Sequence, residues 1–287
     1  PAQHFAELVE EKTNGTVIID IYPGAQLGGA RDMLENIRQG TLDMGWIETA
    51  VYDNITPVFN GLQLPFLAGS SENAYKFYES DLAQKILDSL EEQNIKGLGL
   101  MPTNMRQFGV NTDLAIETPE DFEGLLIRAP ENQMLLESFT QLGMDTTSLP
   151  YQEIYSAMQT GVIDGLDSPT TTWWTDGFYE VVDTLSILNA YPWPAIPTVN
   201  LDAFNGLSDE QQQAMVEAAE ETYTYLLEVI EEETPKALEE MENAGVTIAD
   251  NIDLQPFKEK MEPLYSEYQD QDPLVGKTIE FFRELEE

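Results

Sequence analysis

Short runs of β-branched and other apolar residues alternate with amphipathic stretches along most of this chain. By composition the runs read as strands, and the predicted strands are residues 17–22, 42–47, 97–101, 107–111, 125–128, 162–165 and 198–204. Apolar residues recur at helical spacing between them, and the predicted helices are residues 5–12, 30–39, 73–93, 132–142 and 151–160. Strands that alternate with helices pack into α/β sheets, so we expect an α/β fold with a parallel-rich sheet.

A very long helix is predicted after this alternating part. Ser208 and Gln211 have the spacing of a capping box, in which each side chain bonds the other residue's backbone N–H. The helix should then run to about Asn243, with a kink at Pro235. The C-terminal third otherwise has few predicted strands and many acidic helical faces.

The charge balance is extreme, with 13 Lys and Arg against 53 Asp and Glu and a formal net charge of −40. A surface this negative repels phosphate backbones, so we expect no nucleic-acid partner. Hydrophobic residues make up 42% of the chain, which indicates a folded protein rather than a disordered acidic one. Salt screens the self-repulsion, since the Debye length is about 3 Å at 1 M. The acid excess favours a protein that works in high salt, with an ordinary acidic protein as the alternative.

The chain has no cysteine, which excludes disulfides and Cys-based metal sites. No apolar run approaches the roughly 20 residues that span a bilayer. The chain opens at Pro1-Ala2-Gln3, already in a helical pattern, so we expect a processed or truncated product.

Arg128 is one of five arginines, and it ends the apolar run Leu125-Leu126-Ile127 just before Ala129-Pro130. An arginine at the end of a buried strand is costly unless it has an anionic partner. Guanidinium can hold a planar carboxylate with two parallel hydrogen bonds, so a bound organic acid is one natural partner. An internal salt bridge to an acidic residue is the alternative.

Polar groups follow several predicted strands at their carboxyl ends, where ligands of open α/β sheets bind. They are Glu48, Arg128 and the turn 164–168. Two α/β lobes with these ends facing each other would form a binding cleft. Aromatic residues flank the same turns, as expected of a small-molecule pocket, and comprise Tyr151, Trp173, Trp174, Tyr191 and Trp193.

Signatures of catalysis are poor. His4 is the only histidine, so histidine-based triads and zinc sites are nearly excluded. The glycine-rich stretch 24–29 lacks the Gly-Lys-Ser/Thr of a phosphate loop. Asp164 and Asp167 are paired carboxylates, but nothing supplies the other ligands of a calcium loop. We therefore expect no enzyme, no metal and no cofactor.

Four motifs resemble those of the DctP-type substrate-binding proteins of TRAP transporters. Residues 124–130, Gly-Leu-Leu-Ile-Arg-Ala-Pro, are similar to one signature of that family, and residues 149–165 are similar to a second. Tyr22-Pro23-Gly24-Ala25-Gln26-Leu27-Gly28 and Leu64-Pro65-Phe66 match two more, in the same order. The resemblance extends from Phe5 to near the C-terminus.

The resemblance implies a two-lobed fold of the periplasmic-binding-protein kind, with a ligand cleft between the lobes and a long connecting helix. Lobe I would comprise residues 1–103 plus 194–233, and lobe II residues 104–193 plus 234–287. Such a protein is periplasmic or otherwise extracytoplasmic. It captures an organic acid by closing its lobes and delivers it to the permease subunits in the membrane. We expect it to act as a monomer.

The resemblance also implies roles for individual residues. Arg128 would bind the ligand carboxylate and Arg106 would be a second cationic group. Glu48 and Thr49 would contribute from lobe I, and Tyr151 would pack on the ligand. Trp173, Tyr191 and Ser168 complete the predicted ligand-binding set.

This chain departs from the family pattern at two points. Ser168 stands where the family usually has Asn, and a hydroxyl offers fewer hydrogen bonds than an amide. The family's first strand is missing from the chain, so we expect the mature protein to be longer.

Two other functions fit the sequence. An α/β hydrolytic or lyase-type enzyme could act on an organic acid through Asp164, Asp167 or Glu48, and a sensory ligand-binding protein could feed a receptor. The aromatic residues suit a sugar acid or an aromatic acid, but a small hydroxy or keto acid would also fit.

Overall fold

The computed structural model describes residues 1–286, and these form two compact units. Unit 1 comprises residues 1–56, 76–103 and 194–229, and unit 2 comprises residues 57–75, 104–193 and 230–286. The predicted lobes place residues 57–75 in lobe I and end its last segment at residue 233, so they divide the chain differently there. Their assignment stays a prediction.

The sheet of unit 1 has three strands, in the order β1 (Met44–Glu48), β8 (Ala195–Asn200) and β2 (Ile95–Gly97). Both pairings are antiparallel, with Met44 opposite Val199 and Ile95 opposite Asn200. The prediction of parallel strands is wrong for this unit. The reason lies in β8, which returns from a distant part of the chain and enters between β1 and β2 in the opposite direction.

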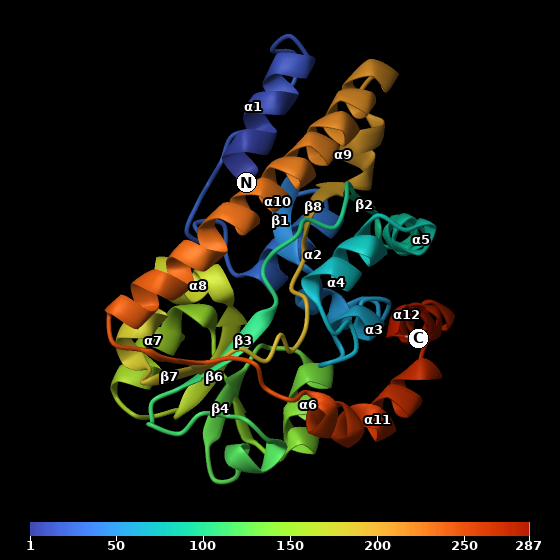
Figure 1. Cartoon of the computed structure of the whole chain (residues 1–287). Helices are drawn as coiled ribbons and strands as arrows, with labels where there is room; N and C mark the ends of the chain where they lie inside the picture. Colours follow the sequence, from blue (N-terminus) through green and yellow to red (C-terminus); the bar gives the residue numbers. More distant parts are fainter. Residues whose placement is uncertain (287) are drawn as a thin grey trace. The chain divides into compact units, whose positions relative to one another are not determined.

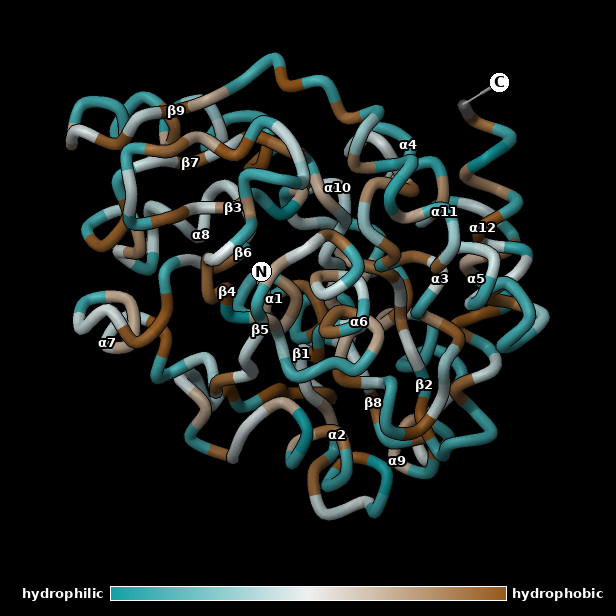
Figure 2. Tube along the Cα trace, turned by 90° about the horizontal axis from the view of Figure 1, so that it is seen from below, coloured by the Kyte–Doolittle hydropathy of each residue, from teal (hydrophilic) through white to brown (hydrophobic). Residues whose placement is uncertain are grey.

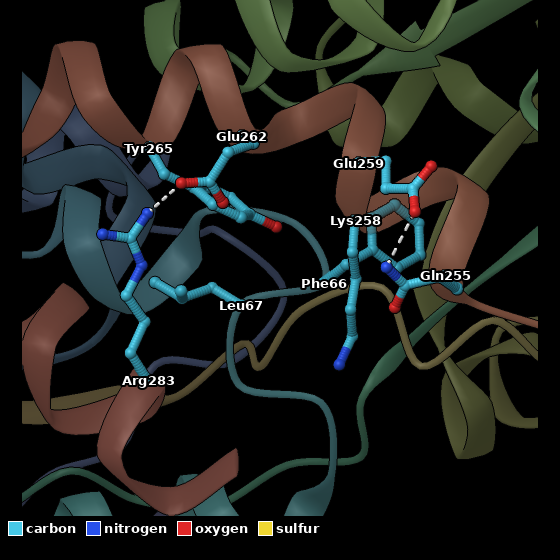
Figure 3. A pocket seen from close by; sticks show the side chains of 8 residues that line it. All are labelled: Phe66, Leu67, Gln255, Lys258, Glu259, Glu262, Tyr265 and Arg283. Atoms are coloured by element: carbon cyan, nitrogen blue, oxygen red, sulfur yellow. Dashed lines mark hydrogen bonds and ion pairs between the residues drawn. The ribbon is translucent and has the colours of Figure 1, made fainter. Parts of the chain in front are cut away.

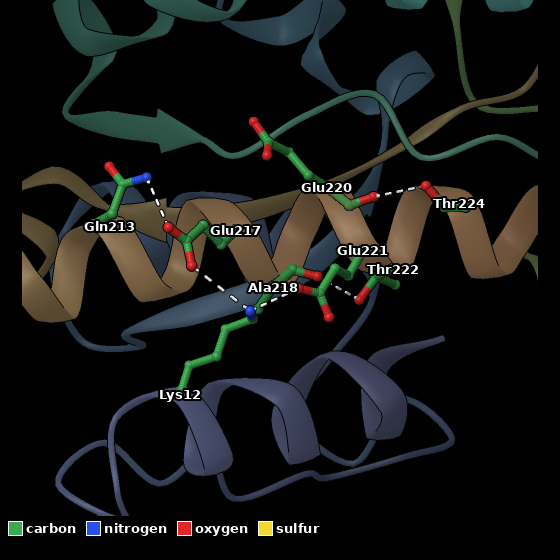
Figure 4. Close-up of polar contacts among 8 residues, drawn as sticks. All are labelled: Lys12, Gln213, Glu217, Ala218, Glu220, Glu221, Thr222 and Thr224. Carbon is green, nitrogen blue, oxygen red and sulfur yellow. Dashed lines mark hydrogen bonds and ion pairs between the residues drawn. The ribbon is translucent and has the colours of Figure 1, made fainter.

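Helices surround this sheet. Those wholly within unit 1 are α1 (Ala2–Lys12), α2 (Ala30–Arg38), η1 (Thr49–Asn54), α5 (Asp81–Ser89), η2 (Leu90–Gln93) and α9 (Leu201–Asn205). Helix α1 packs against α10 (Asp209–Asn243), and Phe5, Val9 and Met215 are buried in their shared core. Figure 4 shows Lys12 of α1 beside α10, where its Nζ lies 2.6 Å from Glu221 and 3.6 Å from Glu217.

The strand predicted at residues 17–22 does not form. Ile18 is 66% exposed and Tyr22 is 55% exposed, and the segment has no strand beside it among the described residues. The Val17 N–H donates to the Thr13 hydroxyl at 3.1 Å, and Val17 and Ile19 pack against the core that Phe5 and Val9 share. A β-branched run favours extended backbone, but a strand also needs a neighbour for its peptide groups.

Unit 2 is built on a mixed six-stranded sheet (Figure 1). Its strands, in spatial order, are β5 (Asp145–Ser148), β4 (Leu126–Ala129), β6 (Gly165–Pro169), β3 (Arg106–Val110), β7 (Thr184–Ser186) and β9 (Thr247–Ala249). Strands β5, β4 and β6 are parallel, as are β7 and β9, whereas β3 runs antiparallel to both β6 and β7. The α/β class is therefore confirmed, and parallel pairing dominates only in this unit.

Helices of unit 2 cover both faces of this sheet or pack on one another. They are α3 (Asn60–Gln63), η3 (Pro119–Phe122), α6 (Gln133–Leu142), η4 (Tyr151–Glu153), α7 (Ile154–Gln159), α8 (Thr170–Thr175), η5 (Phe178–Val181), α11 (Gln255–Gln269) and α12 (Pro273–Glu286). In Figure 1, α7 and α8 lie on one side of the strands and α6 with α11 on the other. Leu166 and Trp173 are buried on the first side, and Phe108 contacts Phe139 on the second.

Strand β6 begins three residues later than predicted, at Gly165 rather than Val162. Asp164 is engaged instead by its side chain, which accepts the Leu126 N–H at 2.8 Å. A Cβ on Gly165 would lie 2.6 Å from the Gly109 carbonyl oxygen, so only glycine fits where the two strands approach. Residues 164–168, predicted as a turn, are therefore mostly strand.

Two helices run from one unit into the other: α4 (Ser71–Tyr78) and the long α10. The capping box of α10 is confirmed, because the Ser208 N–H donates to Gln211 Oε1 at 2.9 Å and the Gln211 N–H donates to Ser208 Oγ at 3.3 Å. Figure 2 shows short teal and brown segments alternating along the helices, which gives them polar and apolar faces. No helix described up to residue 286 combines the length and apolar character that crossing a bilayer requires.

Candidate carboxylate site in unit 2

Arg128 lies near the end of β4, and Pro130 follows the strand directly. Its side chain is buried, at 5% exposure. Nε and Nη2 both donate to the Leu149 carbonyl oxygen, at 3.2 and 3.0 Å. Within residues 1–286, no carboxylate forms an ion pair with Arg128. One edge of the guanidinium is thus anchored to a main-chain carbonyl, and its charge is not neutralised by the protein.

The electrostatics of Arg128 reflect this lack of a counter-ion. Burial lowers its pKa, and the neighbouring Arg106 lowers it further, against the opposing effect of Asp167. A lowered pKa in a base means that its charged form is disfavoured where it sits. A bound anion would reverse that penalty.

Arg106 opens β3 and, unlike Arg128, has a carboxylate partner. Its Nε donates to Asp167 Oδ2, and its Nη2 donates to the Asp167 main-chain oxygen at 2.6 Å. The guanidinium also lies over the Trp193 ring, 4.2 Å from the centroid. Burial lowers the pKa of Arg106, but Asp167 and Tyr191 raise it more. Its charge is therefore compensated inside the protein.

Tyr191 belongs to the same buried group. Its hydroxyl donates to Asp167 Oδ2, and the residue is fully buried. Burial, and after it the carboxylate of Asp167, raise the pKa of Tyr191, so it stays a neutral donor. Its ring also approaches Phe139 of α6, with centroids 6.4 Å apart.

Ser168 lies on the same face of the sheet as Arg128. Strands β4 and β6 are parallel with Arg128 opposite Leu166, and side chains alternate along a strand, so Leu166 and Ser168 share the face of Arg128. The Ser168 carbonyl accepts the Trp173 indole N–H at 3.0 Å. Trp173 itself is fully buried, and it packs so closely on Gly109 that a Cβ there would lie 2.4 Å from the ring. The structure thus places Trp173 in the core, behind Ser168.

Tyr151 begins η4, two residues after the carbonyl that anchors Arg128. Its side chain is 45% exposed, and its ring and that of Phe178 are arranged edge to face, with centroids 5.7 Å apart. Its hydroxyl donates to Asp176. Burial and then Asp176 raise the pKa of Tyr151, whereas Arg106 and Arg128 are close enough to lower it. An exposed, fixed aromatic ring near the free arginine is what a ligand could pack on.

Glu48 and Thr49 belong to unit 1, at the end of β1 and the start of η1. Thr49 is buried at 1% exposure, and both its N–H and its hydroxyl donate to the Pro194 carbonyl, at 3.0 and 3.2 Å. Glu48 is half-buried. Burial and, more weakly, Glu48 raise the pKa of Tyr52. Their predicted contact with the ligand stays a prediction.

The sequence did not reveal the partner of Arg106. In the sequence, Asp164 and Asp167 stood out as paired carboxylates and as acid/base candidates of an alternative enzyme. In the structure their roles differ, because Asp164 accepts the Leu126 N–H and Asp167 accepts from Arg106. Residues 1–286 contain no cluster of three or more His, Cys, Asp or Glu that could hold a metal. His4 stacks on Tyr225 with centroids 4.1 Å apart.

A separate cavity of about 210 Å³ lies in unit 2, between α11, α12 and the segment Phe66-Leu67. Figure 3 shows Arg283 pointing to Glu262 across one end of it, and Lys258 on the other side of Phe66. None of the predicted ligand-binding residues lines this cavity.

Comparison with known proteins identifies relatives over nearly the whole chain. The family described as bacterial extracellular solute-binding protein, family 7, matches residues 1–272. A 2,3-diketo-L-gulonate-binding periplasmic protein of Escherichia coli is 30% identical, over 91% of this chain and 79% of that protein. A solute-binding protein of Chromohalobacter salexigens is 31% identical, over 96% of this chain and 82% of its own.

Solved structures agree with this fold. A TRAP periplasmic solute-binding protein of C. salexigens with bound D-glucuronate is 30% identical, with a TM-score of 0.93 over 99% of this chain and 94% of its own. A similar protein of a Sulfitobacter species with bound β-D-galacturonate is 25% identical, with a TM-score of 0.92 and the same two coverages.

Proposed function

Because the chain belongs to family 7 of the bacterial extracellular solute-binding proteins, we propose that it captures a sugar acid outside the cytoplasm for a TRAP transporter. Proteins of this type bind small organic acids and work with membrane permease components. Relatives at 25% to 30% identity hold galacturonate or glucuronate, and one is named for 2,3-diketo-L-gulonate. These ligands share a carboxylate on a polyhydroxylated or oxidised carbon chain.

The observation that carries the proposal is the free charge of Arg128. It is buried, anchored on one edge by Leu149, and has no carboxylate partner within residues 1–286. A ligand carboxylate would accept from the remaining N–H groups and relieve the penalty of the buried charge. The Ser168 hydroxyl on the same face would add a hydrogen bond, and the Tyr151 ring would pack on the carbon skeleton.

The other predicted residues take supporting roles in this proposal. Trp173 holds the backbone of Ser168, and Tyr191 holds Asp167, which in turn holds Arg106. Arg106 would attract the ligand through its positive charge without forming the main ion pair with the carboxylate, because Arg106 is already paired with Asp167. Contacts from Glu48 and Thr49 remain predicted.

Calorimetric titration with uronates and aldonates tests the proposal. We expect wild-type protein to bind at least one of them, and Arg128→Ala to lower its affinity about thirtyfold or more, since truncating one partner of a buried charge pair costs about 2–5 kcal/mol. Arg38→Ala is the matched control, because Arg38 pairs with Glu35 in unit 1 and should leave affinity unchanged. Equal affinity of Arg128→Ala and wild type would refute the assignment of Arg128 as the residue that binds the ligand carboxylate.

Binding without turnover separates this proposal from an enzyme acting on an organic acid. The acid should be recovered unchanged by NMR after prolonged incubation with the protein, and loss of the starting acid would favour the enzyme. Delivery to a permease rather than to a receptor would appear as protein-dependent uptake of the acid by vesicles that contain the permease.

A further inference from the structure

Asp167 is the only acidic side chain bonded to either of the two arginines of the site among the described residues. It lies on β6, opposite Phe108 of β3, and is fully buried. Its Oδ2 accepts from both Arg106 and Tyr191. Its Oδ1 is also buried, and no hydrogen-bond donor contacts it within residues 1–286. The negative charge of Asp167 is therefore directed at Arg106 and Tyr191 and is not shared with solvent.

The charges of this group do not cancel. Arg106 and Arg128 contribute two positive charges and Asp167 one negative charge, so one positive charge remains. Arg128 lies opposite Leu166 on the neighbouring strand, and Leu166 directly precedes Asp167, so Arg128 and the ion pair of Arg106 with Asp167 occupy adjacent positions of β4, β6 and β3. In keeping with this placement, Asp167 raises the pKa of Arg128 as well as that of Arg106. Glu131 also acts on Arg128, but it is exposed and solvent screens it. Tyr151 and Tyr191 are neutral, because their pKa values are raised.

We propose that Asp167 sets the charge class of the ligand, so that the site accepts a monocarboxylate and rejects a dicarboxylate of the same carbon skeleton. This inference rests on the proposed function and adds a selectivity to it. One ligand carboxylate balances the single uncompensated charge. A second carboxylate would lose hydration near a group that has no further positive charge to offer, and it would meet the field of a buried aspartate.

The site would thus separate two classes that the relatives include. A C4-dicarboxylate-binding periplasmic protein of Rhodobacter capsulatus is 29% identical to this chain, whereas the protein of C. salexigens holds glucuronate. Overall sequence similarity does not decide between these classes, but the local charge of the site does.

Matched pairs of acids test this selectivity. D-Gluconate and D-glucarate differ only at C6, where a hydroxymethyl group becomes a second carboxylate, and D-galactonate with galactarate and D-erythronate with meso-tartrate form similar pairs. In calorimetry at neutral pH and high salt, we expect each monocarboxylate that binds to bind at least tenfold tighter than its dicarboxylate. A wild-type protein that binds a dicarboxylate as tightly as its partner overturns the inference while leaving the proposed function intact. If no acid of either class binds, both fall.

Variants locate the selectivity at Asp167. Asp167→Asn keeps the shape and raises the charge of the group by one, so the preference should shift at least tenfold toward the dicarboxylate. The double variant Arg106→Gln with Asp167→Asn restores a single positive charge, so its preference should return to the monocarboxylate. Glu120→Gln, which removes a negative charge from the exposed surface of unit 2 where Glu120 pairs with Lys260, should leave the preference unchanged. If Asp167→Asn does not fold, the double variant decides: loss of the monocarboxylate preference there overturns the inference.

Discussion

The two arginines of the candidate site, Arg106 and Arg128, should respond differently to replacement by methionine. Methionine has a similar length and no charge, so it can occupy much of the space of the arginine stem. Arg128→Met removes a buried charge that has no counter-ion within residues 1–286, whereas Arg106→Met strips Asp167 of its partner. The perturbation is therefore chemically identical, and only the electrostatic surroundings differ.

The magnitudes follow from those surroundings. Arg106→Met leaves a fully buried carboxylate unpaired, which costs about 3–5 kcal/mol. Arg128→Met relieves a desolvation penalty of several kcal/mol but leaves the Leu149 carbonyl without its donor, which costs about 1–3 kcal/mol. These two effects nearly offset each other. Without ligand, the free energy of unfolding of Arg128→Met should therefore lie within about 1 kcal/mol of the wild-type value or above it.

Thermal unfolding without ligand measures the contrast. A loss of about 3–5 kcal/mol lowers Tm by roughly 6–15 °C in a chain of this size, so Arg106→Met should melt clearly below Arg128→Met. Adding a sugar acid should raise the Tm of Arg106→Met but not that of Arg128→Met, because only proteins that keep Arg128 gain stability from the ligand. An equal drop in Tm for both variants would show that Arg128 has an internal counter-ion, and the reasoning about its free charge would fail.

Three further predictions concern the core, the pocket wall and the surface. Gly109→Ala should lower stability by about 1–3 kcal/mol, because a Cβ would lie 2.4 Å from the Trp173 ring, whereas Gly29→Ala, with only one side-chain atom within 4 Å, should change it little in the same thermal assay. Tyr151→Ala should weaken sugar-acid binding about tenfold or more in calorimetry, while Tyr151→Phe, which keeps the ring, should bind within a few-fold of wild type. Raising NaCl from 0.1 to 2 M should raise Tm by several degrees, because salt screens the net charge of −40, and a flat response would reject the high-salt interpretation.

Local sequence signals predicted much of the fold. The capping box at Ser208 and the length of α10 depend on residues a few positions apart, and both were predicted correctly. Strand β4, which ends next to Pro130, was also found. The strand at 17–22 was wrong because its composition says nothing about whether another strand lies beside it. The direction of β8 was missed for a similar reason, since its neighbours β1 and β2 are about 100 to 150 residues away in sequence.

In the candidate site, too, features that depend on neighbouring residues were predicted, and features that depend on distant residues were not. Arg128 could be singled out from its own neighbours in sequence, because a charge at the end of an apolar run before a proline is unusual. Asp167 could not be assigned to Arg106, because 61 residues separate them and the chain offers 53 acidic residues as partners. Their pairing depends on the antiparallel register of β3 and β6, which no short pattern encodes.

The anchor of Arg128 is a main-chain carbonyl, that of Leu149, and this has a consequence for how such a protein changes over generations. A carbonyl is present whatever side chain its residue carries. Substitutions at Leu149 or Tyr151 can therefore reshape the wall of the pocket while the guanidinium keeps its orientation. Point mutations in the pocket wall can therefore change which acid is preferred, while the protein keeps its ability to bind a carboxylate.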